Sequence, residues 1–210
     1  MRELAFRGVQ VAAGPGVRAL FRTTRHGHKL VSTRGGIVLA FNHLSFLDPI
    51  LLELSIPRPV YFLGKREVLG NRLTAFLLVR LCGHIPVYSD RANEQALERA
   101  TAVLAEGRAI ALAPEGTRSH DGRIRPGKTG VAILAYRTGC PVYPVGIRGT
   151  DSAWPRERML PRPFRRTWVS VGTPLTVEAD AEAAEDPRRL RELTDRIMRA
   201  VSQLAGEART

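Results

Sequence analysis

Ile37-Val38-Leu39-Ala40-Phe41 is an unbroken apolar run that leads directly into Asn42 and His43. A continuous run of this kind is typical of a strand buried on both faces, as in a parallel sheet covered by helices. Sheets of this type place their functional sites just past the carboxyl ends of the strands. We therefore expect 37–41 to be a central strand, with His43 at a site.

Strand and helix signals alternate along the rest of the chain. Apolar runs predict strands at 37–41, 60–63, 85–88, 109–113, 142–147 and 167–171. Apolar residues at helical spacing predict helices at 71–82, from Asn93 to Gly107, from Val131 to Gly139 and from Asp186 to Leu204. This alternation predicts an α/β fold, a single domain with a mixed, mostly parallel sheet flanked by helices.

Residues 1–25 differ from the rest, because apolar residues are mixed there with five arginines. Gly14-Pro15-Gly16 predicts a break that leaves two short amphipathic helices. Such a segment can lie in the headgroup region of a membrane as a basic anchor, or it can pack against its own domain. We treat residues 1–25 as an N-terminal segment and 26–210 as the main domain.

The chain carries 32 Lys+Arg against 20 Asp+Glu, a formal net charge of +12. Such a surface attracts anionic membranes, polyanionic substrates or nucleic acid, although a high arginine content can also reflect genomic base composition. No apolar run reaches the roughly 18 residues of a membrane-spanning helix, and no signal peptide is expected. Cys82 and Cys140 lack accompanying ligand residues, so we expect reduced thiols and no metal site.

A second basic segment interleaves arginines with large apolar residues. Three interpretations are open: contact with an anionic membrane interface, a packed loop with solvated arginines, and, least favoured, single-stranded nucleic acid. The residues are Trp154, Arg156, Arg158, Met159, Leu160, Arg162, Phe164, Arg165, Arg166 and Trp168.

His43 and Asp48 are five residues apart, which in a helix would place them about 140° apart around the axis. We therefore expect His43 in the loop before a helix and Asp48 in its first turn, where Pro49 is also tolerated. A carboxylate there would fix the imidazole tautomer and leave the other nitrogen free to accept a proton from an alcohol. Taken alone, the pair also fits two solvent-exposed residues at a helix start.

Pro114-Glu115-Gly116-Thr117-Arg118-Ser119 forms a second polar cluster after a predicted strand. Gly116 lets a ligand approach the backbone, two hydroxyls flank Arg118, and a guanidinium can hold a phosphate through two parallel hydrogen bonds. The alternative is a polar turn with an ordinary surface arginine.

These clusters, in this order, resemble the lysophosphatidic acid and glycerol-3-phosphate acyltransferase family over roughly residues 30–150. Four blocks match: Asn42, His43 and Asp48; Gly64-Lys65-Arg66-Glu67 with Arg91; the run 114–119; and Val142-Tyr143-Pro144-Val145. The chain departs from the family pattern at Ala113 and Gly127, where the family commonly has phenylalanine.

The resemblance implies a role for each matched residue. His43 is expected to act as general base on the acceptor hydroxyl, and Asp48 to orient it. The hydroxyl then attacks an acyl thioester, without a covalent acyl-enzyme. The residues expected to bind the acceptor are Lys65, Arg91, Glu115, Gly116, Thr117 and Arg118.

The resemblance further implies conversion of 1-acyl-glycerol-3-phosphate to phosphatidic acid, with acyl-CoA or acyl-carrier protein as the donor and no cofactor. Residues 26–210 would then be the acyltransferase domain, attached peripherally or monotopically to the cytoplasmic face of a membrane. Two alternatives are the same chemistry on another acceptor, such as glycerol-3-phosphate, another lysophospholipid or a glycolipid, and a non-catalytic basic module that binds lipid or nucleic acid.

Overall fold

The structure is a computed structural model that describes residues 2–65, 85–87, 92–158 and 160–207. The predicted helix at 71–82, Arg91 and Cys82 lie outside these residues.

Seven strands of the described chain form one sheet in the order β1-β7-β6-β2-β5-β3-β4. Only β6 and β7 pair antiparallel, and every other neighbouring pair is parallel. The predicted α/β class with a mixed, mostly parallel sheet is therefore confirmed. The bounds are β1 Thr23–His26, β2 Ile37–Phe41, β3 Val60–Lys65, β4 Ile85–Val87, β5 Ala109–Leu112, β6 Val142–Arg148 and β7 Thr167–Val171.

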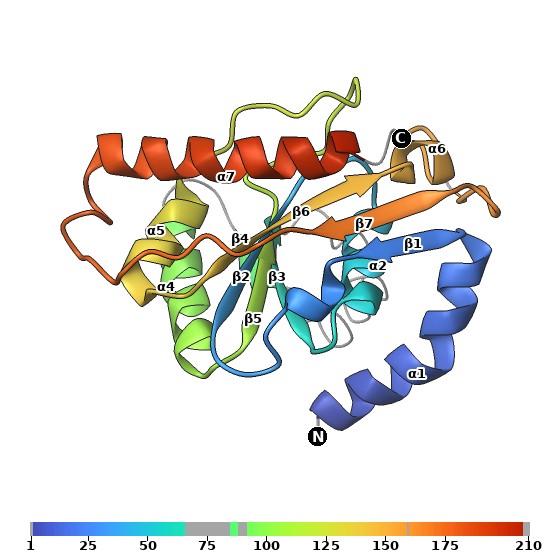
Figure 1. Ribbon diagram of the computed structural model, residues 1–210, viewed down its shortest axis with the longest axis horizontal. Helices are drawn as coiled ribbons and strands as arrows, with labels where there is room; N and C mark the ends of the chain where they lie inside the picture. Colours follow the sequence, from blue (N-terminus) through green and yellow to red (C-terminus); the bar gives the residue numbers. More distant parts are fainter. Residues whose placement is uncertain (1, 66–84, 88–91, 159, 208–210) are drawn as a thin grey trace.

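Helices cover both faces of this sheet (Figure 1). Strand β2 is buried along its whole length, and its residues alternate between two apolar cores. Ile37, Leu39 and Phe41 pack in the core that includes α2, whereas Val38 and Ala40 pack in the core with α4, α5 and α7. The helices are α1 Arg2–Leu20, η1 His28–Leu30, α2 Leu47–Ser55, α4 Ala92–Ala105, α5 Gly130–Thr138, α6 Thr150–Ala153 and α7 Pro187–Glu207.

Helix ends follow the local sequence signals closely. Gly139 ends α5 with a left-handed φ of 65°, and its N–H donates to Ala135 at 2.8 Å. Asp186 caps α7, where its Oδ1 accepts from the N–H of Arg188 at 2.9 Å. Helix α4 begins at Ala92, one residue before the expected cap at Asn93.

The predicted break at Gly14-Pro15-Gly16 is wrong, because α1 is one helix with Pro15 inside it. Proline removes one helical hydrogen bond and bends a helix without having to end it, and Figure 1 shows α1 changing direction along its length. Side chains on both sides of Pro15 hold the carboxyl end of α2: Gln10 Nε2 donates to the Ile56 carbonyl at 2.6 Å, and Arg18 Nη1 to that of Leu54 at 3.0 Å.

The N-terminal segment is joined to the sheet as well as to α2. Strand β1, which the sequence did not predict, spans residue 25, where we placed the end of that segment, and pairs with β7. Within the described residues, no helix is both long and apolar enough to cross a membrane.

Candidate active site

The two predicted clusters meet at the carboxyl edge of the sheet. Strands β2 and β5 are parallel neighbours with Ala40 opposite Leu112, so the segments that follow them start side by side. The first segment carries His43 and leads into α2, and the second carries residues 114–119. The main chains of the two segments are joined by a hydrogen bond, in which the N–H of Ser119 donates to the His43 carbonyl at 2.7 Å.

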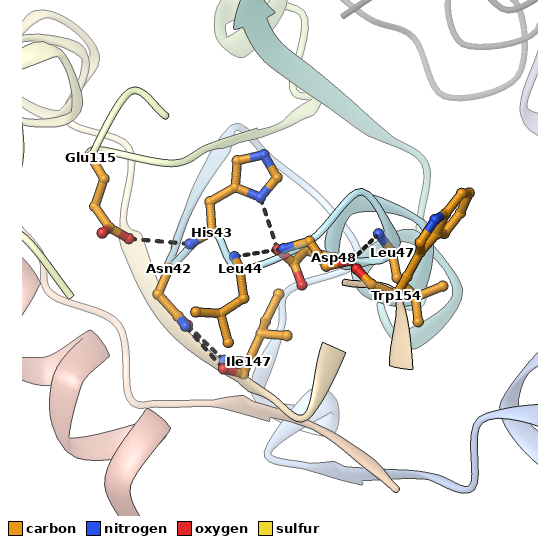
Figure 2. Close-up of polar contacts among 9 residues, drawn as sticks. Asn42, His43, Leu44, Leu47, Asp48, Glu115, Ile147 and Trp154 are labelled. Carbon is orange, nitrogen blue, oxygen red and sulfur yellow. Dashed lines mark hydrogen bonds and ion pairs between the residues drawn. The ribbon is translucent and has the colours of Figure 1, made fainter. Parts of the chain in front are cut away.

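His43 and Asp48 form the expected pair. The His43 Nδ1 lies 2.8 Å from Asp48 Oδ2, with the imidazole in the loop before α2 and the carboxylate in the first turn of that helix. Figure 2 shows the other ring nitrogen, Nε2, pointing away from Asp48. The histidine side chain is 21% exposed and the aspartate is fully buried, so part of the imidazole remains accessible from outside.

The Asp48 carboxylate is held by the main chain that it helps to fold. Its Oδ2 also accepts from the N–H group of Leu44 at 2.6 Å (Figure 2) and from that of Ser45 at 2.7 Å. These donors belong to the turn that begins α2, where the helix dipole favours negative charge. These two main-chain bonds therefore fix the orientation of the carboxylate against the imidazole. The carboxylate would stabilise an imidazolium if the ring took up a proton.

Asn42 fixes the backbone just before the histidine. Its side chain is buried and makes both possible bonds with Ile147 on β6: Nδ2 donates to the carbonyl at 2.9 Å, and Oδ1 accepts from the N–H at 2.7 Å. The amide thus continues the β2–β6 pairing past the end of β2. Asn42 was identified from the sequence as part of the first family block. Its bonds to β6 could be recognised only once β6 was known to be the neighbour of β2.

Glu115 connects the two segments instead of pointing at an open site. One oxygen accepts from the N–H of His43 at 3.1 Å, and the other accepts from the N–H of Arg125 at 3.0 Å. The residue is 8% exposed, and burial raises the pKa of its carboxyl despite these two bonds. Because both oxygens serve the main chain, the geometry supports a positioning role for this residue.

Gly116 and Thr117 lie on the turn that follows Glu115. Gly116 adopts a left-handed φ of 71°, and a Cβ there would lie 3.1 Å from Cε of Lys128. Glycine is therefore favoured by the backbone as well as by the close lysine. Thr117 is exposed on this turn, and Lys128 was not predicted as a site residue although it lies in the Gly127-Lys128-Thr129-Gly130 run.

Arg118 lies against an aromatic residue of the first segment. Its guanidinium carbon is 3.7 Å from the centre of the Phe46 ring, and that ring lies 6.2 Å from the Trp154 ring. Burial, followed by the neighbouring charge of Arg156, holds the pKa of Arg118 below its usual range. Its Nη1 is buried and bonds to no residue that the structure describes, which leaves a donor available for an anion.

Phe46, Ser45 and Trp154 were not predicted as site residues. Ser45 Oγ donates to the Trp154 carbonyl at 2.7 Å and thereby joins the turn before α2 to the end of α6. Phe46 lies inside the His43–Asp48 spacing, so its position was visible in the sequence. Its partner Arg118 could be assigned only after the two strand ends were known to meet.

The remaining two predicted binding residues stay predictions. Lys65 is the last residue of β3, the other neighbour of β5, so its main chain lies toward the same edge of the sheet. Arg91 lies outside the described residues.

Comparison with known proteins agrees with the residue blocks. A family model described as Acyltransferase matches residues 22–148. A 1-acyl-sn-glycerol-3-phosphate acyltransferase of Cocos nucifera is 32% identical over 145 residues, which cover 67% of this chain and 46% of the relative. Another from Borreliella burgdorferi is 29% identical over 128 residues, covering 60% of this chain and 51% of that protein. The chain thus spans about half the length of these curated relatives.

The fold is also found in a solved structure. The crystal structure of the 1-acyl-sn-glycerophosphate acyltransferase PlsC from Thermotoga maritima aligns with a TM-score of 0.69 at 23% identity. The alignment covers 98% of this chain and 80% of that protein. The family match includes both segments of the site and more than half of the residues, and the chain belongs to the acyltransferase family.

Proposed function

We propose that this protein transfers a fatty acyl group from a thioester donor, acyl-CoA or acyl-carrier protein, to the free hydroxyl of 1-acyl-glycerol-3-phosphate, giving phosphatidic acid. The observation that carries the proposal is the His43–Asp48 pair at 2.8 Å, with Nε2 directed away from the carboxylate. The names of the relatives support the choice of acceptor.

The proposed reaction needs one proton acceptor and no covalent acyl-enzyme. His43 Nε2 removes the proton of the acceptor hydroxyl as its oxygen attacks the thioester carbonyl. The C–S bond then breaks, and the imidazolium returns the proton to the leaving thiolate. Asp48 stabilises the imidazolium between these two steps, because its oxygen already accepts from Nδ1.

The acceptor phosphate would be bound by cations around the second segment. Arg118 has a buried donor that bonds to no described residue, and the side chain of Lys128, from the segment before α5, lies close to Gly116. Lys65 and Arg91 would add to this charge by resemblance to the family. A bilayer lipid as acceptor and a net charge of +12 together support attachment to the cytoplasmic face of a membrane, peripherally or monotopically.

Thiol release from acyl-CoA and from acyl-carrier protein, measured with a panel of acceptors, tests this function. The panel contains 1-acyl-glycerol-3-phosphate, glycerol-3-phosphate, a lysophosphatidylcholine and a glycolipid. We expect release with the first acceptor and a loss of roughly 10²–10⁴-fold in His43→Ala, the usual contribution of a general base. His26→Ala, an exposed histidine on β1, is the matched control and should retain wild-type turnover.

Three outcomes would contradict the proposal or its mechanism. Release only with the glycolipid would exclude phosphatidic acid as the product, and no release with any acceptor would favour a binding module. A His43→Ala variant with near wild-type turnover would remove the general base from the mechanism.

A further inference from the structure

A surface away from the His43–Asp48 pair is formed where the end of α1 meets the described residues 155–158 and 160–166, between α6 and β7. The N–H of Phe164 donates to the carbonyl of Leu20 at 2.6 Å, so the two segments are bonded. At the other end, the N–H of Arg162 donates to the Ala153 carbonyl at 2.6 Å. Figure 1 shows α1 and this segment at one edge of the molecule.

Large apolar side chains are exposed on this surface. Leu160 is 74% exposed, Phe164 is 62% exposed and Leu20 is 40% exposed. A single exposed apolar residue is ordinary in a folded protein. Three of them on two segments joined by a main-chain hydrogen bond make this edge a candidate contact surface.

The backbone conformation presents Phe164 outward against its local preference. Phe164 has a φ of 62° and Arg22 a φ of 41°, and these are the only non-glycine residues of the described chain with positive φ. A left-handed conformation is unfavourable for a bulky aromatic residue. Both residues lie beside the Phe164–Leu20 bond, so the strain is confined to the junction that exposes the ring.

The charge around these residues is strongly positive. The segment 155–166 contains five arginines and one acidic residue, Glu157. Arg165 and Arg166 follow Phe164 directly, and both are exposed, as is Arg22 on the other segment. Aromatic and aliphatic side chains among arginines are complementary to the headgroups and outer acyl chains of an anionic bilayer. Leu20 and Leu160 have no ring on which a nucleotide base could stack.

The surface is connected to the candidate active site. Ala153, which accepts from Arg162, precedes Trp154, whose carbonyl accepts from Ser45 in the catalytic turn. The docking edge and the turn that carries His43 are therefore held together through residues 153 and 154.

We propose that Leu20, Leu160 and Phe164, surrounded by Arg22, Arg165 and Arg166, dock this protein on an anionic lipid bilayer. The proposal deepens the proposed function, whose acceptor is a bilayer lipid, by naming the surface that reaches the bilayer. The proposal rests on the backbone strain at Phe164, the exposure of the three apolar side chains and the charge of the neighbouring arginines. Its test does not depend on enzyme turnover.

Vesicle flotation of the full chain tests the docking surface. The vesicles consist of phosphatidylcholine alone or of phosphatidylcholine with phosphatidylglycerol, and the key variant is Phe164→Gly. Glycine accepts positive φ without strain, so we expect a higher melting temperature together with a fall of on the order of tenfold in binding to anionic vesicles. A merely structural role for Phe164 would not raise stability while lowering binding.

Two further variants provide a control at another exposed apolar residue and a test of the arginine charges. Leu30→Ser alters a residue that is 53% exposed in η1, after the far end of β1, and it should leave flotation unchanged. Arg165→Gln with Arg166→Gln should reduce binding to the anionic vesicles and weaken its dependence on salt, since each arginine contributes through a screened charge.

Several outcomes would overturn the proposal. The first is equal flotation of the wild type on neutral and anionic vesicles, and the second is unchanged flotation of Phe164→Gly. The third is that Phe164→Gly loses only oligonucleotide binding, or only self-association. Acyl transfer by the wild-type chain to a monomeric short-chain acceptor is measured separately. Its absence would count against the proposed function and leave the docking result intact.

Discussion

Asp48 places one carboxylate oxygen where it serves the fold and, in the proposed mechanism, the imidazole of His43. Three groups donate to Oδ2: the imidazole Nδ1 and the main-chain N–H groups of Leu44 and Ser45. The residue is fully buried, and removing its side chain takes the acceptor away from two main-chain donors and one imidazole donor at once. Removal of the side chain should therefore affect stability as well as turnover.

Asp48→Ala and Asp48→Asn should separate these two effects. In the alanine variant the donors lose their acceptor, and we expect a loss of on the order of 3 kcal/mol in the free energy of unfolding. In the asparagine variant an oxygen can still accept, so stability falls less. Turnover should fall by roughly 10²-fold or more, because no negative charge stabilises the imidazolium. Urea unfolding and thiol release measure the two quantities, with exposed Asp151→Asn as control; equal stability of both variants would contradict this division.

Phe46 is expected to position Arg118 for the acceptor phosphate. The guanidinium carbon lies over the ring, 3.7 Å from its centre, and such contacts contribute about 0.5–2 kcal/mol. Phe46→Leu keeps an apolar side chain but removes the ring face. We expect KM for the phosphorylated acceptor to rise by about threefold to thirtyfold, with a smaller change in kcat.

Phe46→Tyr is the matched control for this prediction, because it retains the ring. It should keep a KM close to that of the wild type in steady-state kinetics. If the leucine variant lowered kcat and left KM unchanged, Phe46 would act on the catalytic turn and not through Arg118.

At the scale of elements, α7 approaches β6 so closely that one position requires glycine. A Cβ at Gly146 would lie 2.4 Å from the main-chain atoms of Ala205 and Leu204. The helix would have to move away from the strand to admit even a methyl group, and overpacking of this kind typically costs about 1–3 kcal/mol.

Gly146→Ala and Gly206→Ala form a matched pair that tests this contact. Gly206 lies on α7, and a Cβ added there would meet nothing within 4 Å, so alanine should increase stability, by up to about 1 kcal/mol, through helix propensity. Gly146→Ala should lower the melting temperature and Gly206→Ala should raise it or leave it unchanged. A neutral Gly146→Ala would contradict the close packing of α7 on β6.

The elements that the sequence predicted well carry their own local signal. The run 37–41 is apolar throughout, and Gly139 and Asp186 mark helix ends by their chemistry. The N-terminal elements lack such signals. Strand β1 is Thr-Thr-Arg-His, which has no apolar run, and it exists because β7 pairs with it. Helix α1 continues past Pro15 because contacts with α2 hold it on both sides.

At the scale of the whole molecule, the candidate site depends on the order of strands, which no local signal encodes. His43 and Glu115 bond although 72 residues separate them. Their motifs could be predicted from spacing and family resemblance, and so could the contact between His43 and Asp48. The role of Glu115 between the two segments, and the contact of Arg118 with Phe46, appear only once β2 and β5 are neighbours.

Glu115 also makes the stability of the whole molecule depend on pH. Burial raises the pKa of this carboxyl, although the N–H groups of Arg125 and His43 act to lower it. A carboxyl whose pKa is higher in the folded chain than in the unfolded chain binds its proton more tightly when folded. Its contribution to stability therefore decreases as pH rises from the ordinary glutamate pKa through the raised value.

Glu115→Gln removes this titration and so reports its sign. We expect the melting temperature of the wild type, relative to that of the variant, to fall as pH rises through this window, because only the wild type must ionise a buried carboxyl. Thermal unfolding of both proteins at a series of pH values between about 4 and about 7 measures the difference. If the difference increased with pH, the pKa of Glu115 would lie below the ordinary value, and its two backbone donors would outweigh burial.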